Sequence, residues 1–283
     1  MGTWLILGRV SNLPTVWSNL LVGWCLEGGG VDVRSITILL FGGSLLYIGG
    51  MFLNDFCDAD FDSRYRPERP IPAGVVSRGL VGWIAGAEFF WGMGLLSMLG
   101  GKILLPAFLL LGCIILYDVV HKKTFLAPFL MGACRVLLYF LGAAAVGHSS
   151  GTGLNLILAG LALGLYVVGI TFFARSESRP DTGTRWSWMF LFLPVLNVST
   201  GDSILNGLYF FLFAGLLLVW MGWLLGSFFL GSNRSVGRVV SGLLAAIVLV
   251  DCLMVAPVLG FQTVWFLIFF VLAILLQRII PAT

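Results

Sequence analysis

Four polar side chains that could hold a metal ion follow the second apolar stretch of the sequence. At 100° per residue in an α-helix, Asp55, Asp58 and Asp62 lie within about 60° of one another, and Asn54 lies beside them. Like charges on one face repel unless a cation bridges them. Hard oxygen ligands suit Mg²⁺, which takes one or two carboxylates together with phosphate oxygens and water. The spacing predicts a Mg²⁺ site at Asp55, Asp58 and Asp62, with a merely solvated helix end as the alternative.

The segment after this acidic face combines arginine with proline. Prolines at positions 67, 70 and 72 prevent a regular helix and favour a rigid, extended path. Arg66 and Arg69 stand in this segment, and a guanidinium group binds phosphate oxygens in a bidentate manner. Both are predicted to bind the diphosphate of a substrate held by the metal. Simple anchoring at the membrane surface is the alternative.

Two further polar segments occupy comparable places between apolar stretches. In the first, Tyr117 and Lys122 are predicted to contact the same diphosphate, whereas Lys123 is more typical of a surface anchor. In the second, Glu177 and Asp181 are four residues apart, which would place both carboxylates on one helix face. They are predicted to be additional metal ligands, although Pro180 interrupts a regular helix between them.

The elements that must position these residues have the composition of membrane spans. Of 283 residues, 59% are hydrophobic and 10% are charged, and the mean hydropathy is +1.03. Nine stretches approach the ~20 residues that cross a bilayer, so the expected fold is an all-α polytopic membrane protein. The nine stretches are Val10–Leu26, Ser35–Asn54, Leu80–Leu99, Ile103–Tyr117, Leu126–Gly147, Leu154–Ala174, Asp202–Ser232, Val239–Pro257 and Phe261–Gln277. The shorter run Trp186–Ser199 is a possible tenth span.

The distribution of basic residues predicts the topology. With a cytoplasmic N-terminus, ten Lys and Arg residues fall inside and two, Arg34 and Lys102, fall outside. The ten are Arg9, Arg64, Arg66, Arg69, Arg78, Lys122, Lys123, Arg175, Arg179 and Arg185. This bias predicts that the three polar segments are cytoplasmic. The expected location is a bacterial inner (plasma) membrane. The cations form short clusters between apolar runs, so no nucleic-acid partner is expected.

Three charged residues lie within the predicted spans themselves: Glu88, Arg135 and Asp251. Charges at this depth are costly in lipid and usually face the interior of the helix bundle. Arg135 is predicted to reach the diphosphate, and an interhelical structural pair explains it equally well. For Glu88 and Asp251 the structural interpretation is favoured.

These residues resemble a known family. The pattern Asn54-Asp55-x-x-Asp58-x-x-x-Asp62, followed by Arg66-Pro-x-Arg69-Pro-Ile-Pro, is similar to the first signature of the UbiA superfamily of intramembrane prenyltransferases. The opening Arg9-x-x-Asn12-x-Pro14 resembles the first helix of that family. The segments around Tyr117 and Arg135 are similar to its EboC-like branch. The resemblance implies a single domain over residues 1–283, with about nine helices around a central cavity.

The resemblance also implies a second acidic motif that binds diphosphate through Mg²⁺. Several Asp residues are usual there, whereas this sequence has Glu177 and Asp181. A Lys is usual four residues after the Tyr, and here that position is His121, so Lys122 is the nearest cation.

The implied activity is Mg²⁺-dependent transfer of a prenyl group from a prenyl diphosphate, through an allylic carbocation, to an unidentified lipophilic or aromatic acceptor in membrane lipid. One alternative is a non-catalytic prenyl- or lipid-binding protein or transporter component. Another is a CDP-alcohol phosphotransferase. That chemistry expects Gly directly after the second Asp, whereas Ala59 follows Asp58.

Overall fold

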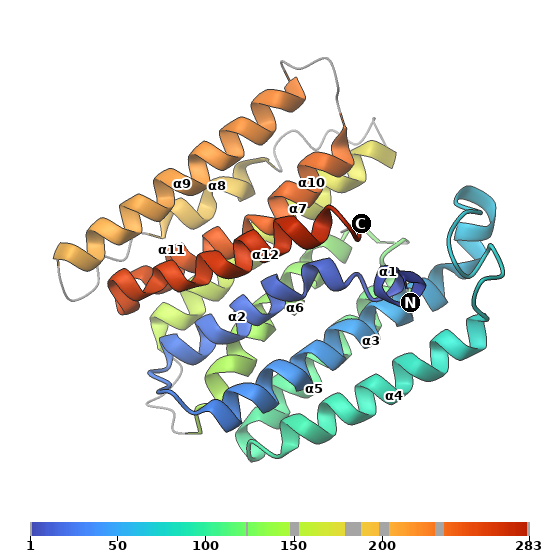
Figure 1. Cartoon of the computed structure of the whole chain (residues 1–283), viewed down its shortest axis with the longest axis horizontal. Coiled ribbons are helices and arrows are strands. Elements are labelled where there is room, and N and C mark those ends of the chain that lie inside the picture. The colour runs from blue at the N-terminus through green and yellow to red at the C-terminus, as the bar shows by residue number, and fades with distance from the viewer. Residues whose placement is uncertain are drawn as a thin grey trace.

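The computed structural model of the chain describes residues 2–122, 124–147, 153–178, 188–197, 204–229 and 235–281. In these residues every regular element is a helix (Figure 1). The first six α-helices are α1 (Gly2–Leu7), α2 (Leu13–Leu26), α3 (Val33–Tyr65), α4 (Arg78–Ser97), α5 (Leu104–Val120) and α6 (Ala127–Ala144). The others are α7 (Leu154–Ser178), α8 (Met189–Leu196), α9 (Ile204–Phe229), α10 (Val236–Ala245), α11 (Ile247–Leu259) and α12 (Leu267–Gln277). Short 3₁₀ turns are η1 (Val10–Asn12), η2 (Gly101–Ile103) and η4 (Gly260–Phe266).

The fold is therefore the expected all-helical membrane architecture. Seven helical segments among the described residues are long and apolar enough to cross a bilayer. The nine predicted spans exceed these seven segments by two, for two reasons. The last segment, Val236–Gln277, has 42 residues, or about 63 Å of helix, enough for two crossings. The first predicted span contains α2, which has 14 residues and falls short of that length.

The possible tenth span is a short helix. Within Trp186–Ser199 the structure describes residues 188–197, where α8 has eight residues, or about 12 Å of helix. That length is less than half of a ~30 Å hydrocarbon layer. Helix α8 packs on α7 and α11, so it does not cross the membrane by itself.

The helix that bears the acidic face is longer than predicted. The span predicted to end at Asn54 continues to Tyr65, and the whole of α3 has 33 residues. The Asp32 carboxylate caps its start by accepting hydrogen bonds from the backbone N–H groups of Arg34 and Ser35. It ends directly before Pro67, as a proline requires. At about 50 Å the helix exceeds the hydrocarbon thickness, so its last turns carry the acidic residues toward the membrane surface.

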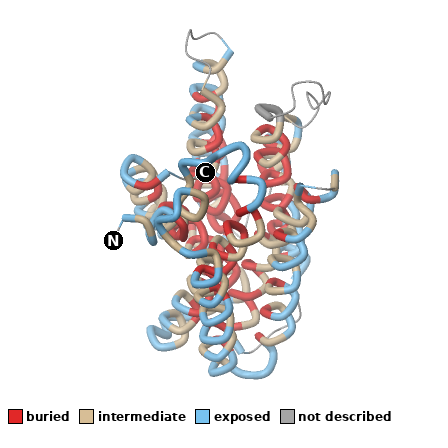
Figure 2. The backbone as a smooth tube through the Cα atoms, turned by 90° about the vertical axis from the view of Figure 1, so that its right-hand side faces the viewer, coloured by how far each residue is buried: buried red, intermediate tan, exposed pale blue. Residues whose placement is uncertain are grey.

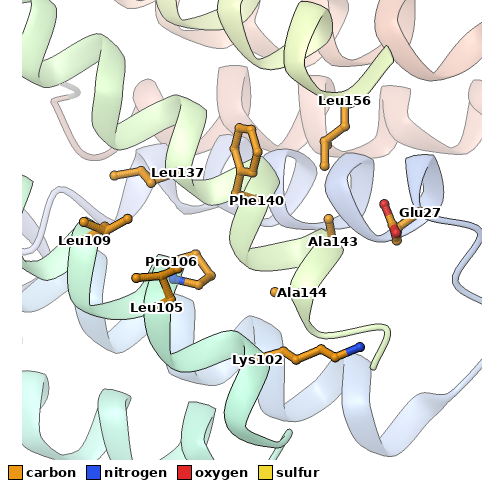
Figure 3. Close-up of a pocket in the computed structure, with 10 residues that line it drawn as sticks. All are labelled: Glu27, Lys102, Leu105, Pro106, Leu109, Leu137, Phe140, Ala143, Ala144 and Leu156. Atoms are coloured by element: carbon orange, nitrogen blue, oxygen red, sulfur yellow. The ribbon is translucent and has the colours of Figure 1, made fainter. Parts of the chain in front are cut away.

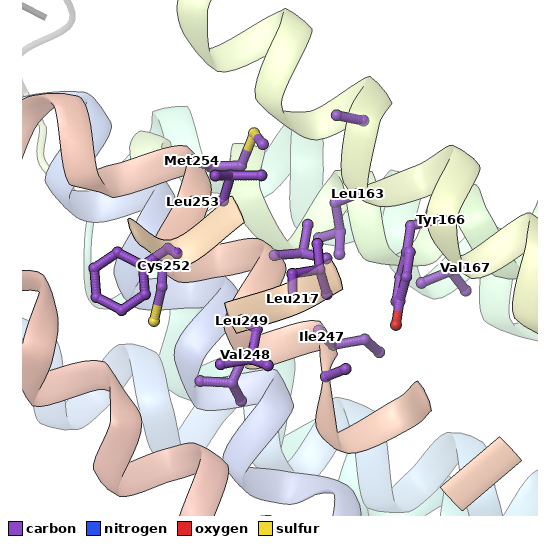
Figure 4. Packing of buried hydrophobic residues seen from close by; sticks show 14 of the residues in the cluster. Leu163, Tyr166, Val167, Leu217, Ile247, Val248, Leu249, Cys252, Leu253 and Met254 are labelled. Carbon is purple, nitrogen blue, oxygen red and sulfur yellow. The ribbon is translucent and has the colours of Figure 1, made fainter. Parts of the chain in front are cut away.

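The core of the molecule surrounds α11. All residues of this helix from Ile247 to Pro257 are buried, and the buried residues gather along the middle of the molecule (Figure 2). Side chains of α7 and α9, such as Tyr166 and Leu217, pack against Ile247–Met254 of α11 (Figure 4). A helix covered on every side is apolar all around, which explains why Asp251 is so unusual at its centre.

Helices α2 and α6 approach each other unusually closely. A Cβ atom added to Gly142 would lie 2.0 Å from the carbonyl oxygen of Leu20, and one added to Gly23 would lie 1.9 Å from that of Tyr139. Small residues at such positions let helix backbones approach within a membrane. The large exposed residues, among them Trp83, Phe90 and Trp91 of α4, form a surface suited to lipid.

Candidate active site

The acidic face of α3 is buried within the protein. Asn54, Asp55, Asp58 and Asp62 are between 3% and 8% exposed, and all four lie on the helical turns that end α3. Asp60 points elsewhere, with a side chain that is 80% exposed and pairs with Arg78 at 3.1 Å. The structure thus separates the four predicted site residues of this helix from the solvated carboxylate between them.

One of the two predicted arginines contacts the acidic face. Arg69 Nη1 lies 3.0 Å from Asp55 Oδ1 and 3.2 Å from Asp62 Oδ2, so a single guanidinium nitrogen bridges two carboxylates. The turns of residues 66–77 bring this arginine back along α3. Arg66, in contrast, is exposed at the end of the helix and makes no ion pair with the described residues.

A second cation, Arg9, reaches the acidic face from the N-terminal end. Its Nη2 atom lies 3.2 Å from Asn54 Oδ1 and 3.5 Å from Asp55 Oδ1. Arg9 has φ 42° and ψ 48°, a left-handed conformation that costs a non-glycine residue about 1–2 kcal/mol. This strain separates α1 from α2 and directs the side chain to α3, as strained residues often do at functional sites. In the sequence, Arg9 is part of the motif that resembles the first helix of the family, but no contact with the acidic face was predicted for it.

The end of α5 completes the surroundings of Asp58. Lys122 Nζ lies 2.6 Å from Asp58 Oδ1, and His121 Nε2 lies 3.4 Å from Oδ2. The ammonium group also sits 3.8 Å above the ring centre of Phe61. Tyr117 stacks on His121 with ring centres 5.1 Å apart, as expected for side chains four residues apart on a helix. Lys122 and Tyr117 are therefore both close to the acidic face.

A residue that the sequence interpretation did not select also lies in this cluster. Asp118 is 4% exposed, and its Oδ1 atom accepts a hydrogen bond of 3.0 Å from Asn54 Nδ2. Its spacing from His121 and Lys122 places it on their face of the helix. This spacing is the sequence feature that could have selected Asp118. It indicates a site only once α5 is known to pack against α3.

The third polar segment approaches the second one. Arg175, near the end of α7, donates a hydrogen bond of 3.2 Å to the carbonyl oxygen of Thr124 and another to that of His121. These contacts hold the connection between α5 and α6 against α7. The side chain of Glu177 and the whole of Asp181 lie outside the described residues, so their predicted role as metal ligands stays a prediction.

Arg135 belongs to a different part of the molecule. Its Nη1 atom donates to Thr15 Oγ1 at 3.0 Å and to Asn19 Oδ1 at 2.8 Å. Asn19 in turn donates to Asp251 at 2.8 and 2.9 Å. These contacts join α2, α6 and α11. They agree with the alternative of an interhelical structural role rather than with contact to the acidic face.

The donor set is suited to a hard cation that a ligand helps to bind. Among the residues that the structure describes, no group of three or more His, Cys, Asp or Glu side chains lies close enough to hold a metal ion. Mg²⁺, however, often takes one or two protein carboxylates and completes its shell with phosphate oxygens and water. The Oδ2 atom of Asp118 is buried and accepts no hydrogen bond from the described part of the chain. It is one more oxygen ligand that a cation could use.

An apolar cavity lies away from the acidic face. About 260 Å³ of open space is lined by apolar side chains of α5 and α6, together with Glu27 and Lys102 (Figure 3). Lys102 precedes α5, whereas Asp118 lies near the end of that helix, so the cavity and the acidic face are at opposite ends of α5. A small hollow at the acidic face is lined by Asp55, Asp62, Arg69 and the segment 70–72.

Fold and site together define a polytopic helical membrane protein with buried carboxylates and basic side chains at one end of a long helix. The model of the UbiA prenyltransferase family matches residues 13–240. The chain therefore belongs to the UbiA prenyltransferase family. The finer resemblance to the EboC-like branch is not tested by this match.

Curated relatives match part of the chain. The digeranylgeranylglyceryl phosphate synthase of Methanopyrus kandleri is 30% identical over 153 residues, which are 52% of this chain and 54% of the relative. The mitochondrial 4-hydroxybenzoate polyprenyltransferase of Saccharomyces cerevisiae is 33% identical over 156 residues, which are 53% of this chain and 40% of the relative. The chain thus spans about half, or less, of the length of the curated relatives it matches.

Solved structures share the fold over nearly the whole chain. A UbiA homologue from Archaeoglobus fulgidus, bound to DMAPP and Mg²⁺, aligns with a TM-score of 0.67 and 13% identity, covering 93% of this chain and 99% of that one. A structure of digeranylgeranylglyceryl phosphate synthase aligns with a TM-score of 0.65 and 21% identity, covering 91% and 97%. At these identities the likeness concerns the fold.

Proposed function

We propose that this chain is an intramembrane prenyltransferase, which moves a prenyl group from a prenyl diphosphate to a lipophilic or aromatic acceptor. The observation that carries the proposal is the buried acidic face of α3, where Arg9, Arg69 and Lys122 meet three carboxylates. Such a cluster is suited to a metal-bound diphosphate, and the neighbouring helices are suited to a prenyl chain. Among the similar proteins named above, one is a polyprenyltransferase and another is a UbiA homologue bound to DMAPP and Mg²⁺.

Mg²⁺ would be held by Asp55, Asp58 and Asp62, with Glu177 and Asp181 as further ligands from the segment after α7. Bound there together with the diphosphate, Mg²⁺ would neutralise the negative charge that develops on the leaving group. The carboxylates are at present balanced by protein cations. An arriving diphosphate would compete for those same cations, so metal and diphosphate should bind cooperatively.

The basic side chains would then hold the diphosphate. Arg69 and Arg9 have planar guanidinium groups that suit paired phosphate oxygens, and Lys122 adds a point charge. Asn54 would donate through its amide and Tyr117 through its hydroxyl group. Arg66 would attract the diphosphate from the surface. Arg135 is instead assigned to the wall of the bundle, because both of its hydrogen bonds go to α2.

Ionisation would break the bond between the allylic carbon and the bridging oxygen, and the diphosphate would keep the electron pair. The basic residues stabilise this charge as it forms. The remaining allylic cation would be protected by apolar surroundings and aromatic faces, with water excluded so that it is not quenched to an alcohol. The acceptor then forms the new bond and releases a proton. One matched relative is named for 4-hydroxybenzoate and another for its product, digeranylgeranylglyceryl phosphate, so the proposed class of acceptor is lipophilic or aromatic.

The chain would belong to the EboC-like branch of the family, because the segments around Tyr117 and Arg135 resemble that branch.

The acidic face would work at the cytoplasmic side of a bacterial inner membrane. This orientation rests on the excess of basic residues in the segments that contain Arg69, Lys122 and Arg175. Cysteines introduced at positions 70 and 124 should resist a membrane-impermeant thiol reagent in intact cells and react in inverted vesicles. Labelling from outside intact cells would contradict the orientation.

Product analysis tests the activity directly. Membranes that contain the protein would be supplied with isotope-labelled prenyl diphosphates of several lengths, and lipid extracts analysed by mass spectrometry. A labelled prenyl adduct, formed with release of diphosphate and absent with Asp58→Asn, would support the proposal. Prenyl diphosphate binding without diphosphate release would indicate the non-catalytic alternative. Release of CMP from a CDP-alcohol would indicate the phosphotransferase.

A further inference from the structure

Asp118 stands apart from the other carboxylates of the site. Asp55 and Asp62 share Arg69, and Asp58 pairs with Lys122 and His121. Asp118 makes no ion pair with any residue that the structure describes. It accepts one hydrogen bond, at Oδ1, from the neutral amide of Asn54.

The other carboxylate oxygen of Asp118 has no hydrogen-bond partner among the residues that the structure describes. Asp118 is 4% exposed, and no donor of those residues reaches Oδ2. Leaving a buried acceptor unsatisfied costs about 1–3 kcal/mol, and more when it is charged. Native proteins satisfy nearly all such groups, so an exception needs a physical reason such as an ion that binds there.

The position of Asp118 indicates that a bound cation would explain its unpartnered Oδ2 atom. Asn54 holds Asp118 in place and is itself held by Arg9, which contacts its Oδ1 atom at 3.2 Å. Asp118 also feels the charge of Asp58 across the contact between α3 and α5. The unpartnered oxygen therefore belongs to the same charged cluster as the acidic face. A cation beside it would supply a direct counter-charge, whereas Arg9 and His121 act on Asp118 without forming an ion pair with it.

We propose that Asp118 is a ligand of the divalent cation at this site and joins Asp58 across the α3–α5 interface. This inference rests on the proposed function. Two carboxylates from two helices, completed by phosphate oxygens, match the coordination that Mg²⁺ prefers. The ligand would come from α5, independently of Glu177 and Asp181. The second acidic motif of this sequence has fewer Asp residues than is usual for the family resemblance, and Asp118 would compensate for that.

The variant Asp118→Asn separates a ligand from a structural contact. The new amide keeps an oxygen that accepts the hydrogen bond from Asn54, so that contact between α3 and α5 survives. It loses the negative charge and replaces Oδ2 by an NH₂ group, which is not a metal ligand. Asp60→Asn is the matched control, because it removes one negative charge from the exposed side of the end of α3.

The test measures Mn²⁺ binding by the electron paramagnetic resonance signal of the free ion, in the presence of geranyl thiolodiphosphate, which ionises too slowly to turn over. Mn²⁺ replaces Mg²⁺ at sites made of oxygen ligands. Asp118→Asn should raise the Kd of Mn²⁺ at least tenfold, while Asp60→Asn changes it less than twofold. The melting temperature of the metal-free variant should equal or exceed that of the wild type, because an unsatisfied buried charge has been removed.

Failure of this inference is distinguishable from failure of the proposed function. A Kd within threefold of the wild-type value for Asp118→Asn, with a large increase for Asp58→Asn, would overturn Asp118 as a ligand and leave the prenyltransferase proposal intact. If the wild-type protein itself binds no Mn²⁺ with the diphosphate analogue, the proposed function fails and the inference fails with it.

Discussion

Two sets of buried carboxylates in this protein have opposite surroundings. Asp251, at the centre of α11, is 0% exposed and accepts hydrogen bonds from Ser18, from Asn19 and from Tyr139, whose hydroxyl oxygen is 2.6 Å away. These donors are short or rigid neutral side chains from α2 and α6. Glycines let α2 and α6 pack closely, and this close packing fixes the positions of the donors.

At the end of α3 the partners are different. Asp55, Asp58 and Asp62 are paired with cations on long side chains. All three of these cations, Arg9, Arg69 and Lys122, come from turns outside the long helices. Long side chains can exchange one partner for another without moving a helix. A carboxylate saturated by neutral donors between packed helices holds the fold together, whereas one balanced by movable cations can exchange them for a ligand.

The largest expected effect comes from Asp58→Asn. If Asp58 is a metal ligand, kcat/KM for the prenyl diphosphate should fall at least a thousandfold, about 4 kcal/mol of transition-state stabilisation. The melting temperature should change little, because the substitution removes a partly exposed ion pair with Lys122, which is worth about 0–1 kcal/mol. Diphosphate release and thermal unfolding in the same detergent measure the two quantities. A variant that retains more than about a tenth of the activity, a loss under ~1.4 kcal/mol, would show that Asp58 is not a metal ligand of the active site.

Asp251→Leu should lower the stability of the protein and leave its activity largely unchanged. It leaves the donors of Ser18, Asn19 and Tyr139 unpaired, and hydrogen bonds between membrane helices contribute about 0.6 kcal/mol on average and up to about 1.7. Three donor residues at that average predict a destabilisation of about 2 kcal/mol, measured by thermal unfolding. The folded fraction should keep its kcat/KM within tenfold. Asp251→Asn is the matched control, since it retains one acceptor oxygen and should lose less than half as much stability. A stable but inactive Asp251→Leu would contradict the comparison.

The acidic face was predictable because it depends on a single local rule. Once residues 54–62 are helical, the helical period alone places Asp55, Asp58 and Asp62 together. The all-helical fold followed equally directly from apolar stretches of spanning length. Span boundaries were less predictable. Charge ended the predicted second span at Asn54, yet the buried ion pairs allow α3 to continue to Tyr65.

The partners of these residues were not predictable from local rules. Asn19 and Asp251 are 232 positions apart, and Asn54 and Asp118 are 64 apart. Such contacts depend on how whole helices pack. The preference for Arg69 over Arg66 depends on the turns that follow α3, and the contact of Arg9 on one left-handed residue. Charge and spacing alone cannot provide either.

The two arginines of the proline-rich segment test whether the cations paired with the acidic face contribute to activity, with a smaller expected effect than Asp58→Asn. Arg69→Gln removes the guanidinium group that bridges Asp55 and Asp62. It should lower kcat/KM about thirtyfold, or about 2 kcal/mol. Arg66→Gln is the matched control, because this exposed residue makes no ion pair with the described residues and should cost less than threefold. Steady-state kinetics on both variants measure the difference, and equal losses would show that contact with the acidic face does not decide which arginine acts.

The smallest expected effect concerns the segment after α7, whose acidic residues the sequence proposes as extra metal ligands. Glu177→Gln and Asp181→Asn should each lower activity about tenfold, or ~1.4 kcal/mol. The loss should be larger at low Mg²⁺, because excess metal offsets a weakened site by mass action. Glu177 should matter more than Asp181, since Pro180 breaks the helical path between them. Titrating activity against Mg²⁺ for both variants, beside the control Asp60→Asn, measures this.

If Glu177→Gln and Asp181→Asn are both neutral at every Mg²⁺ concentration, as solvated carboxylates would be, the segment after α7 provides no ligand. The catalytic carboxylates then all come from α3 and α5. Under that outcome the effect of Asp118→Asn on metal binding should be as large as that of Asp58→Asn, because no other carboxylate would replace it. A neutral result at Glu177 and Asp181 together with a small effect at Asp118 would leave the three carboxylates of α3 as the whole acidic contribution to the site.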